Sequence, residues 1–219
     1  MSALPPNLRA RILDAAKREP APTRAVQTKR ALLAGVAGAC LSIVISAATG
    51  GPTHQRRAFI VALVGIGAAL MAVVATWVAG ARGTSMLGRS RSTLVAIAVA
   101  APVAILAWSL FASSVEGTAP IAGESMRAHA VCFAFTLFFA AGPFAALAYA
   151  RRASDPVHPR ALGAALGGAA GAWGGMFIDV HCAFTSAAHF TLGHAAPIAL
   201  LAATGALLGA RLFGVRAKD

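Results

Sequence analysis

The chain has 219 residues, of which 58% are hydrophobic and only 12% are charged, and its mean hydropathy is +0.72. Soluble domains carry roughly 25% charged residues, so the composition excludes an ordinary soluble fold and predicts a protein embedded in a lipid bilayer. The formal net charge of +12 does not indicate nucleic acid, because the arginines stand in short clusters between long apolar segments instead of forming one binding surface. We expect no direct contact with nucleic acid.

Residues 1–30 predict a basic cytoplasmic arm that contains a short amphipathic helix. Because so short a helix is marginal in water, it should fold only when it docks, either into a protein groove or onto the anionic inner leaflet. A proline-containing spacer, Pro20–Arg30, would be unnecessary for lipid attachment alone, which favours a protein partner. Apolar and basic side chains fall on different faces of the helix, with Leu8 and Ile12 on the first and Arg9 and Arg11 on the second.

Six apolar segments follow, each near the ~20 residues that a helix needs to cross the hydrocarbon core. The backbone must satisfy its own hydrogen bonds there, and strand-type alternation is absent from the sequence, so all six are interpreted as helices. The prediction is an all-α integral membrane protein with a six-helix transmembrane domain over residues 31–213 and a cytoplasmic tail over residues 214–219. The segments are Leu32–Thr49, Ala58–Gly80, Thr93–Ser114, His129–Ala150, Ala161–Val180 and His189–Phe213.

The distribution of lysine and arginine gives the predicted orientation of the bundle. Sixteen of the 19 lie in the arm, in the second and fourth connections between segments, and at the C-terminal end. The other three, Arg56, Arg57 and Arg127, lie in the remaining connections. Because lysine and arginine accumulate on the cytoplasmic side of a membrane, both termini are predicted to be cytoplasmic. The regular alternation also supports an even number of spans.

Small residues and prolines predict how the helices pack. Glycines repeat every four residues in the last two segments, which favours close approach of helix backbones in lipid. Prolines inside three segments predict kinks, whose freed carbonyls need other partners. The glycines are Gly163, Gly167, Gly171, Gly175, Gly205 and Gly209, and the prolines are Pro102, Pro143 and Pro197.

Histidines and cysteines gather at the predicted outer end of the bundle. Five of the six histidines and two of the three cysteines fall there, whereas His158 faces the cytoplasm and Cys40 lies within the first segment. Polar groups are costly next to apolar segments, so the grouping needs an explanation. Its members are His54, His129, Cys132, His181, Cys182, His189 and His194.

Three interpretations of this grouping stay open. Cys132 and Cys182 share a membrane depth and face an oxidising compartment, so they could form a disulfide or sense oxidants. Histidines at helix ends also serve as plain interfacial residues, with rings between lipid and water. Alternatively, imidazole and thiolate suit a zinc or copper ion, whose ligands would come from His129, Cys132, His181, Cys182 and His189.

Asp179, near the outer end of the fifth segment, has two interpretations. It could orient a histidine that binds a metal, or it could be a solvated carboxylate at the interface, which is the interpretation we favour. Three serines, Ser109, Ser113 and Ser114, end the third segment on the same side. No nucleophile motif and no HExxH pair accompanies them in the sequence, so we expect no enzyme.

The chain resembles a known family in its architecture, in its arm and in its last two segments. The arm sequence LRARILDAAKREPAPTR and the later pattern HC…H…GHAAPIALLAATGALLGARL are similar to the polytopic anti-sigma factors of the NrsF and CarR type. The resemblance implies a multi-pass protein of the bacterial inner membrane. Such a protein holds an extracytoplasmic-function sigma factor inactive until it senses an envelope, oxidative, metal or light stimulus.

The resemblance also implies roles for particular residues. Cys132 and Cys182 would be the sensor residues. The cytoplasmic part has no room for a zinc-bearing anti-sigma domain, so recognition must use the arm and the short loops. The arm would contact the sigma factor through Leu8, Arg9, Arg11, Ile12 and Leu13.

The main rival hypothesis is a redox or metal-handling membrane protein that holds haem or copper between its helices. His129 and either His189 or His194 would be the ligands near the outer surface. A small transporter is a further alternative. Ion paths usually contain intramembrane charge, and among the acidic residues only Asp179 falls within a predicted segment, which argues against a transporter.

Overall fold

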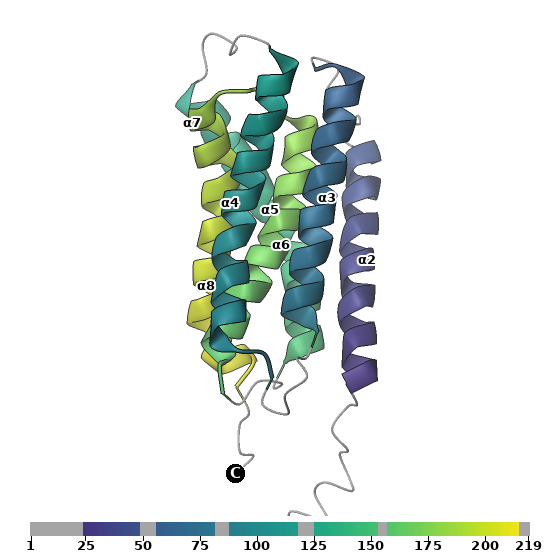
Figure 1. Cartoon of the computed structure of the whole chain (residues 1–219), viewed down its shortest axis with the longest axis vertical. Coiled ribbons are helices and arrows are strands. Elements are labelled where there is room, and N and C mark those ends of the chain that lie inside the picture. Colours follow the sequence, from purple (N-terminus) through teal and green to yellow (C-terminus); the bar gives the residue numbers. More distant parts are fainter. Residues whose placement is uncertain (1–23, 49–55, 82–87, 118–124, 153–156, 215–219) are drawn as a thin grey trace, which may run out of the picture.

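Long helices make up nearly all of the part of the chain that the computed structural model describes, residues 24–48, 56–81, 88–117, 125–152 and 157–214 (Figure 1). These residues contain no strand, so the prediction of an all-α protein is confirmed for them. The arm residues Leu8 to Leu13 and the loop residue His54 lie outside the described residues. The helices are α2 (Arg24–Ala48), α3 (Ala58–Gly80), α4 (Arg91–Glu116), α5 (Met126–Arg151), α6 (Pro159–His181), α7 (Ala187–His189), the π-helix η1 (Phe190–Ala195) and α8 (Ala196–Leu212).

Five of the helical stretches described are long and apolar enough to cross a membrane. They are α3, α4, α5, α6 and the continuous stretch Ala187–Leu212. The predicted first segment lies in α2, which begins at Arg24, inside the region that the sequence assigns to the arm and its spacer. The sixth span therefore stays a prediction.

The helices run alternately up and down, and the two ends of the bundle differ (Figure 1). The beginning of α2 and the end of α8 lie at one end, here called the arm end, and α7 lies at the other, here called the cluster end. The placement of both chain termini on one side of a membrane stays a prediction. Which side is cytoplasmic is the prediction made from the lysine and arginine count.

Helix α6 occupies the centre of the bundle, in contact with α3, α4, α5 and α8. It is buried along most of its length, as expected for a helix that is apolar on all sides. Glycines allow α8 to approach it closely, because a Cβ added at Gly163 would meet the carbonyl oxygen of Gly205, and one added at Gly167 would meet that of Leu201. The predicted glycine packing is confirmed.

A buried ion pair joins α3 and α4 at the cluster end. Arg56, just before α3, donates from Nε to Oε2 of Glu116, the last residue of α4, at 2.8 Å, and both side chains are buried. From the sequence, Arg56 was predicted only as one of the charges of an outer connection. The helix is longer than the predicted segment, and its last turn carries the carboxylate that pairs with this arginine.

The last stretch is not the single α-helix that the sequence predicts. A short helix α7 is followed by six residues of π-helix, η1, before α8 begins. The backbone N–H of Ala196 donates to the carbonyl of Thr191, five residues earlier, which is the π-type bond. Pro197, expected to kink the helix, is the second residue of α8 and lies just after the π-helix.

Candidate functional site: a buried thiol–imidazole cluster

Two thiols and two imidazoles meet at the cluster end, and we call this group the thiol–imidazole cluster. Cys132 lies on α5, Cys182 directly follows α6, His189 ends α7 and His194 lies in η1. One ligand atom from each of the four lies within 4.8 Å of the others. All four side chains are buried, and both histidines are 0% exposed.

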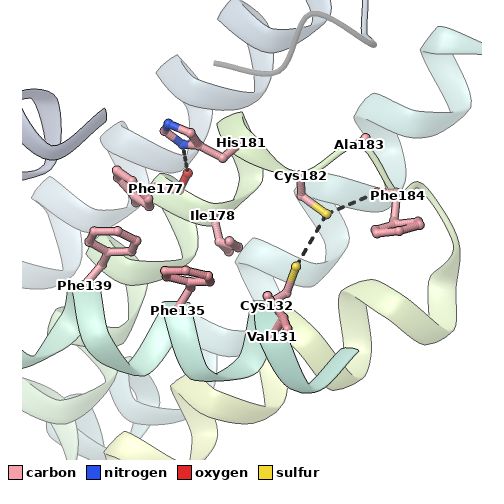
Figure 2. Close-up of a pocket in the computed structure, with 10 residues that line it drawn as sticks. All are labelled: Val131, Cys132, Phe135, Phe139, Phe177, Ile178, His181, Cys182, Ala183 and Phe184. Carbon is pink, nitrogen blue, oxygen red and sulfur yellow. Dashed lines mark hydrogen bonds between the residues drawn. The ribbon is translucent and has the colours of Figure 1, made fainter. Parts of the chain in front are cut away.

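The two thiols, one on α5 and one at the end of α6, face each other. Their sulfur atoms are 3.9 Å apart, and both cysteines are free thiols (Figure 2). Cys182 Sγ also lies 3.2 Å from Nε2 of His189. This arrangement can hold a metal ion, and the sulfurs are also near enough for oxidation to join them after a small movement, since a disulfide is about 2.05 Å long.

The π-helix brings the two histidines of the cluster to the same side. Their positions differ by five residues, which in an α-helix of 3.6 residues per turn would leave them about 140° apart. A π-type turn takes up one more residue, which brings residues five apart closer to the same side of the helix. The rings of His189 and His194 lie edge to face with centroids 5.3 Å apart. Without η1, one of the two rings would point away from the thiols.

His194 is held in place by Asp179 and Ser109. Its Nδ1 pairs with Oδ1 of Asp179, and the Ser109 hydroxyl lies 2.9 Å from the other carboxylate oxygen, Oδ2. Asp179 is only 1% exposed, so our preferred interpretation of a solvated interfacial carboxylate is wrong. The other ring nitrogen of His194, Nε2, has no hydrogen-bond partner although it is buried.

His189 is positioned by a serine cap and by a second histidine. Ser186 is the N-cap of α7, and its Oγ accepts from the backbone N–H of His189 at 3.1 Å. The Nδ1 atoms of His189 and His129 are 2.9 Å apart, so His189 can donate its Nδ1 proton and leave the Nε2 lone pair for the cluster. His129 therefore supports the cluster from behind instead of joining it.

A threonine and a glycine fix η1 against α5 beside the cluster. The Oγ1 atom of Thr136 lies 3.1 Å from the carbonyl oxygen of Gly193 and 2.9 Å from that of Cys132. A Cβ added at Gly193 would lie 3.1 Å from Cβ of Cys132, so the glycine permits this close approach. Neither residue could be predicted from the sequence, because a threonine and a glycine within apolar helices give no pattern that marks them.

Only three of the five residues predicted as metal ligands belong to the thiol–imidazole cluster. The structure brings Cys132, Cys182 and His189 together and adds His194, which was predicted only as an alternative ligand of a haem or copper centre. His181 lies elsewhere, with Nδ1 2.8 Å from the carbonyl oxygen of Phe177 and its ring stacked on that side chain. Figure 2 shows this ring turned away from the two sulfur atoms.

The geometry excludes an iron held between the Nδ1 atoms of His129 and His189. An iron between two ring nitrogens needs them about 4 Å apart, because each metal–nitrogen bond is about 2.0–2.1 Å long. The two Nδ1 atoms are in direct contact at 2.9 Å. No iron fits between these two nitrogens in this arrangement.

A pocket of about 420 Å³ opens beside the cluster. Both cysteines line one side of it, and phenyl rings from α5 and α6 line the other (Figure 2). The walls of the pocket are mostly apolar, and the two thiols are among the few polar groups that line it. Its lining residues are Val131, Cys132, Phe135, Phe139, Phe177, Ile178, His181, Cys182, Ala183 and Phe184.

Comparison with known proteins identifies the family. The family described as negative regulator of sigma F, NrsF, matches residues 15–214. The match includes the whole cluster and begins after the predicted contact residues Leu8 to Leu13. No curated protein and no solved structure matches the chain. Since the matched region covers most of the sequence, the chain belongs to the NrsF family, and it is a membrane protein that negatively regulates a sigma factor.

Proposed function

We propose that this protein is an anti-sigma factor of the bacterial inner membrane that sequesters an extracytoplasmic-function sigma factor. It releases this partner when a stimulus acts on Cys132 and Cys182. Membership of the NrsF family supports the regulatory role, and five long apolar helices support the membrane location. The protein acts by binding and is not an enzyme.

One observation carries the sensor assignment: two free, buried thiols, 3.9 Å apart, come from different helices at the cluster end of the bundle. A chemical change at two such sulfurs alters how α5 and α6 are joined. A thiol placed only for packing would need no second thiol and no imidazole at contact distance. The pair is therefore suited to report a stimulus through helix position.

The arm supplies the binding site for the sigma factor. Its amphipathic pattern fits a helix that lays Leu8, Ile12 and Leu13 into an apolar groove, while Arg9 and Arg11 meet acidic side chains on the partner. The arm joins α2 at the arm end of the bundle. Sequestration at the membrane then keeps the sigma factor away from RNA polymerase without any catalytic step.

A signal reaches the arm only if the bundle has two arrangements with different affinity for the stimulus. Helix α6 is the physical link, because it ends beside Cys182 and packs against α8 over its whole length towards the arm end. Turning a mostly bound partner into a mostly free one requires about 5.5 kcal/mol of differential binding. Bonds to two sulfurs can supply a change of this size.

The experiment is a pull-down from native membranes, with bound proteins identified by mass spectrometry. The intact protein should retain a sigma factor, and a variant without residues 2–20 should not. Recovery of no sigma factor with the intact protein, even after crosslinking in unstressed cells, would contradict the proposal.

The sensor assignment is tested with a reporter gene that the released sigma factor transcribes. Cys132→Ser and Cys182→Ser should each abolish induction by oxidants or metal ions and leave basal repression intact. Cys40→Ser is the matched control, since Cys40 is exposed on α2, and it should respond normally. Normal induction in both cluster variants would exclude the thiols as sensors.

A further inference from the structure

We propose that the thiol–imidazole cluster binds one Zn²⁺ ion through Cys132, Cys182, His189 and His194, with Asp179 and His129 orienting the two imidazoles. The site itself stands on geometry and donor chemistry. Its meaning for regulation rests on the proposed function, because the ion would occupy the thiols to which we assign the sensor role.

The distances fit a tetrahedral ion. With Zn–S bonds of about 2.3 Å and Zn–N bonds of about 2.0–2.1 Å, two sulfurs on one ion lie about 3.8 Å apart, and a sulfur and a nitrogen about 3.6 Å apart. The observed separations are 3.9 Å between the sulfurs and 3.2 Å between Cys182 Sγ and His189 Nε2. Small shifts of side chains are enough to reach two Zn–S and two Zn–N bonds of these lengths.

The nitrogen Nε2 of His194 independently indicates a ligand. It lies on a ring that is 0% exposed, and it has no hydrogen-bond partner. The pairing of Nδ1 with Asp179 places the proton on Nδ1, so that Nε2 offers its lone pair. Buried polar atoms without partners are rare and costly, and a metal ion among the other three ligand atoms would satisfy this one.

The groups behind the ligands are those that zinc sites use. Histidine ligands usually donate their second N–H to a carboxylate or another acceptor, which fixes the tautomer and raises the basicity of the ring. Asp179 accepts from His194 in this way, and Ser109 in turn donates to Asp179. His129 can accept from His189 in the same way, since their Nδ1 atoms are 2.9 Å apart. Neither support would be needed if the rings only filled space.

Charge favours a divalent ion over Cu⁺. Binding Zn²⁺ displaces one proton from each thiol, and the two thiolates then balance the two positive charges. With Cu⁺ the same two thiolates would leave one negative charge uncompensated, a short distance from the buried Asp179 carboxylate. Burial of unpaired charge is costly in an apolar interior, so Zn²⁺ is the better fit.

A bound ion would tie together three parts of the bundle. Its ligands come from α5, from the residue that ends α6 and from the α7–η1 stretch. Zinc with four protein ligands is typical of sites that stabilise a fold. Loading or losing the ion would thus lock or release the cluster end, which names the event that the proposed sensor detects.

The test is a titration of the purified, metal-free and reduced full-length protein with Co²⁺ as a spectroscopic probe, followed by Zn²⁺. We expect one Co²⁺ per chain, with the intense visible bands of a tetrahedral ion and sulfur-to-cobalt charge-transfer absorption. Zn²⁺ should then displace it. Weak octahedral spectra, no uptake, or binding of Cu⁺ with exclusion of Zn²⁺ would overturn the assignment.

Zinc affinities of single variants distinguish the ligands of the ion from residues that only lie near it. Asp179→Asn should lower the zinc affinity about 10–100-fold, the usual effect of losing a group that orients a ligand, and His194→Ala should lower it further. His181→Ala is the matched control, because His181 adjoins Cys182 in sequence but lies on Phe177, and it should bind zinc normally. Equal effects of His181→Ala and His194→Ala would overturn the ligand set.

The wild-type protein decides the matter even where a variant fails to fold. Zinc should protect Cys132 and Cys182 from alkylation, and the exposed Cys40 should react equally with and without zinc. Unchanged alkylation of the cluster thiols would contradict the site.

The sigma-factor pull-down on the same preparations keeps the two proposals apart. A protein that retains the sigma factor but binds no zinc overturns only the zinc site, and the reverse result overturns only the proposed function.

Discussion

The two ends of α6 are held by different kinds of contact. Towards the arm end, Gly163 lies directly against Gly205 of α8, with no room for a side chain between the two backbones. At the cluster end, Asp179 and Cys182 meet histidines, a serine and a second thiol. Close contact between helix backbones in lipid depends on how well the two helix surfaces fit together. Contacts between titratable or metal-binding groups depend on protons, ions and oxidants, so only the second end can respond to chemistry.

The largest loss of stability is expected where the glycine contact is broken. Gly163→Leu puts a side chain against the carbonyl of Gly205, so α6 and α8 must move apart as whole helices. We expect a cost of more than about 3 kcal/mol, above the usual range for overpacked cores, measured by thermal unfolding in detergent.

The control for the glycine contact is Gly142→Ala, whose Cβ would meet only the end of the Leu41 side chain at 3.1 Å. It should be tolerated, because a flexible side chain can shift by a few tenths of an ångström. Similar losses at Gly142 and Gly163 would show that backbone contact is not special to α6 and α8.

An ion pair also makes part of the cluster end rigid. Glu116→Gln leaves Arg56 buried without its counter-charge, and removing one partner of a buried pair costs about 3 kcal/mol or more. We expect a lower midpoint of thermal unfolding but an unchanged affinity of the cluster for zinc. The double variant Arg56→Met with Glu116→Gln should recover part of the stability. A double variant less stable than the single one would contradict this account.

The smallest effect is expected at Thr136. Thr136→Val removes the hydroxyl that joins α5 to η1 through Gly193 and keeps nearly the same volume. The expected cost is about 1 kcal/mol, the net value of one hydrogen bond. Because the hydroxyl lies beside the cluster, the threshold of the reporter response should shift although stability barely changes. Thr76→Val, at a hydroxyl that accepts from Trp173 in the middle of the bundle, is the control and should leave the threshold unchanged.

Hydropathy predicted the spans well and their ends less well. Helix α3 covers the predicted Ala58–Gly80 residue for residue. Helices α4 and α5 begin two and three residues earlier than predicted, because Ser90 and Ser125 cap them from outside the apolar windows. A cap depends on one side-chain oxygen, and an average over some 20 residues does not register it. The π-helix was missed for a related reason, since its six residues lie inside one apolar segment, and hydropathy does not distinguish π-helix from α-helix.

The sequence predicted at which end of the bundle the candidate site lies, but not which residues form it. The alternation of spans brings Cys132, Cys182 and His189 to one end, and the structure shows them together. Choosing between His181 and His194 requires the helix geometry. His181 still belongs to α6 and turns towards Phe177, while η1 rotates His194 to the thiols. Asp179 was misplaced because its partner is fifteen residues away along the chain, and its burial depends on that partner.

The π-helix also determines in which direction the side chains of α8 point around the helix axis. Each residue of an α-helix turns the chain by about 100°, and a π-type turn takes up one extra residue. The glycine stripe of α8 faces α6 only with η1 in its present form. If residues 190–195 adopted ordinary α geometry, α8 would rotate by about that angle relative to α7. The segment that places His194 beside the two sulfurs therefore also determines the rotation of α8 about its axis.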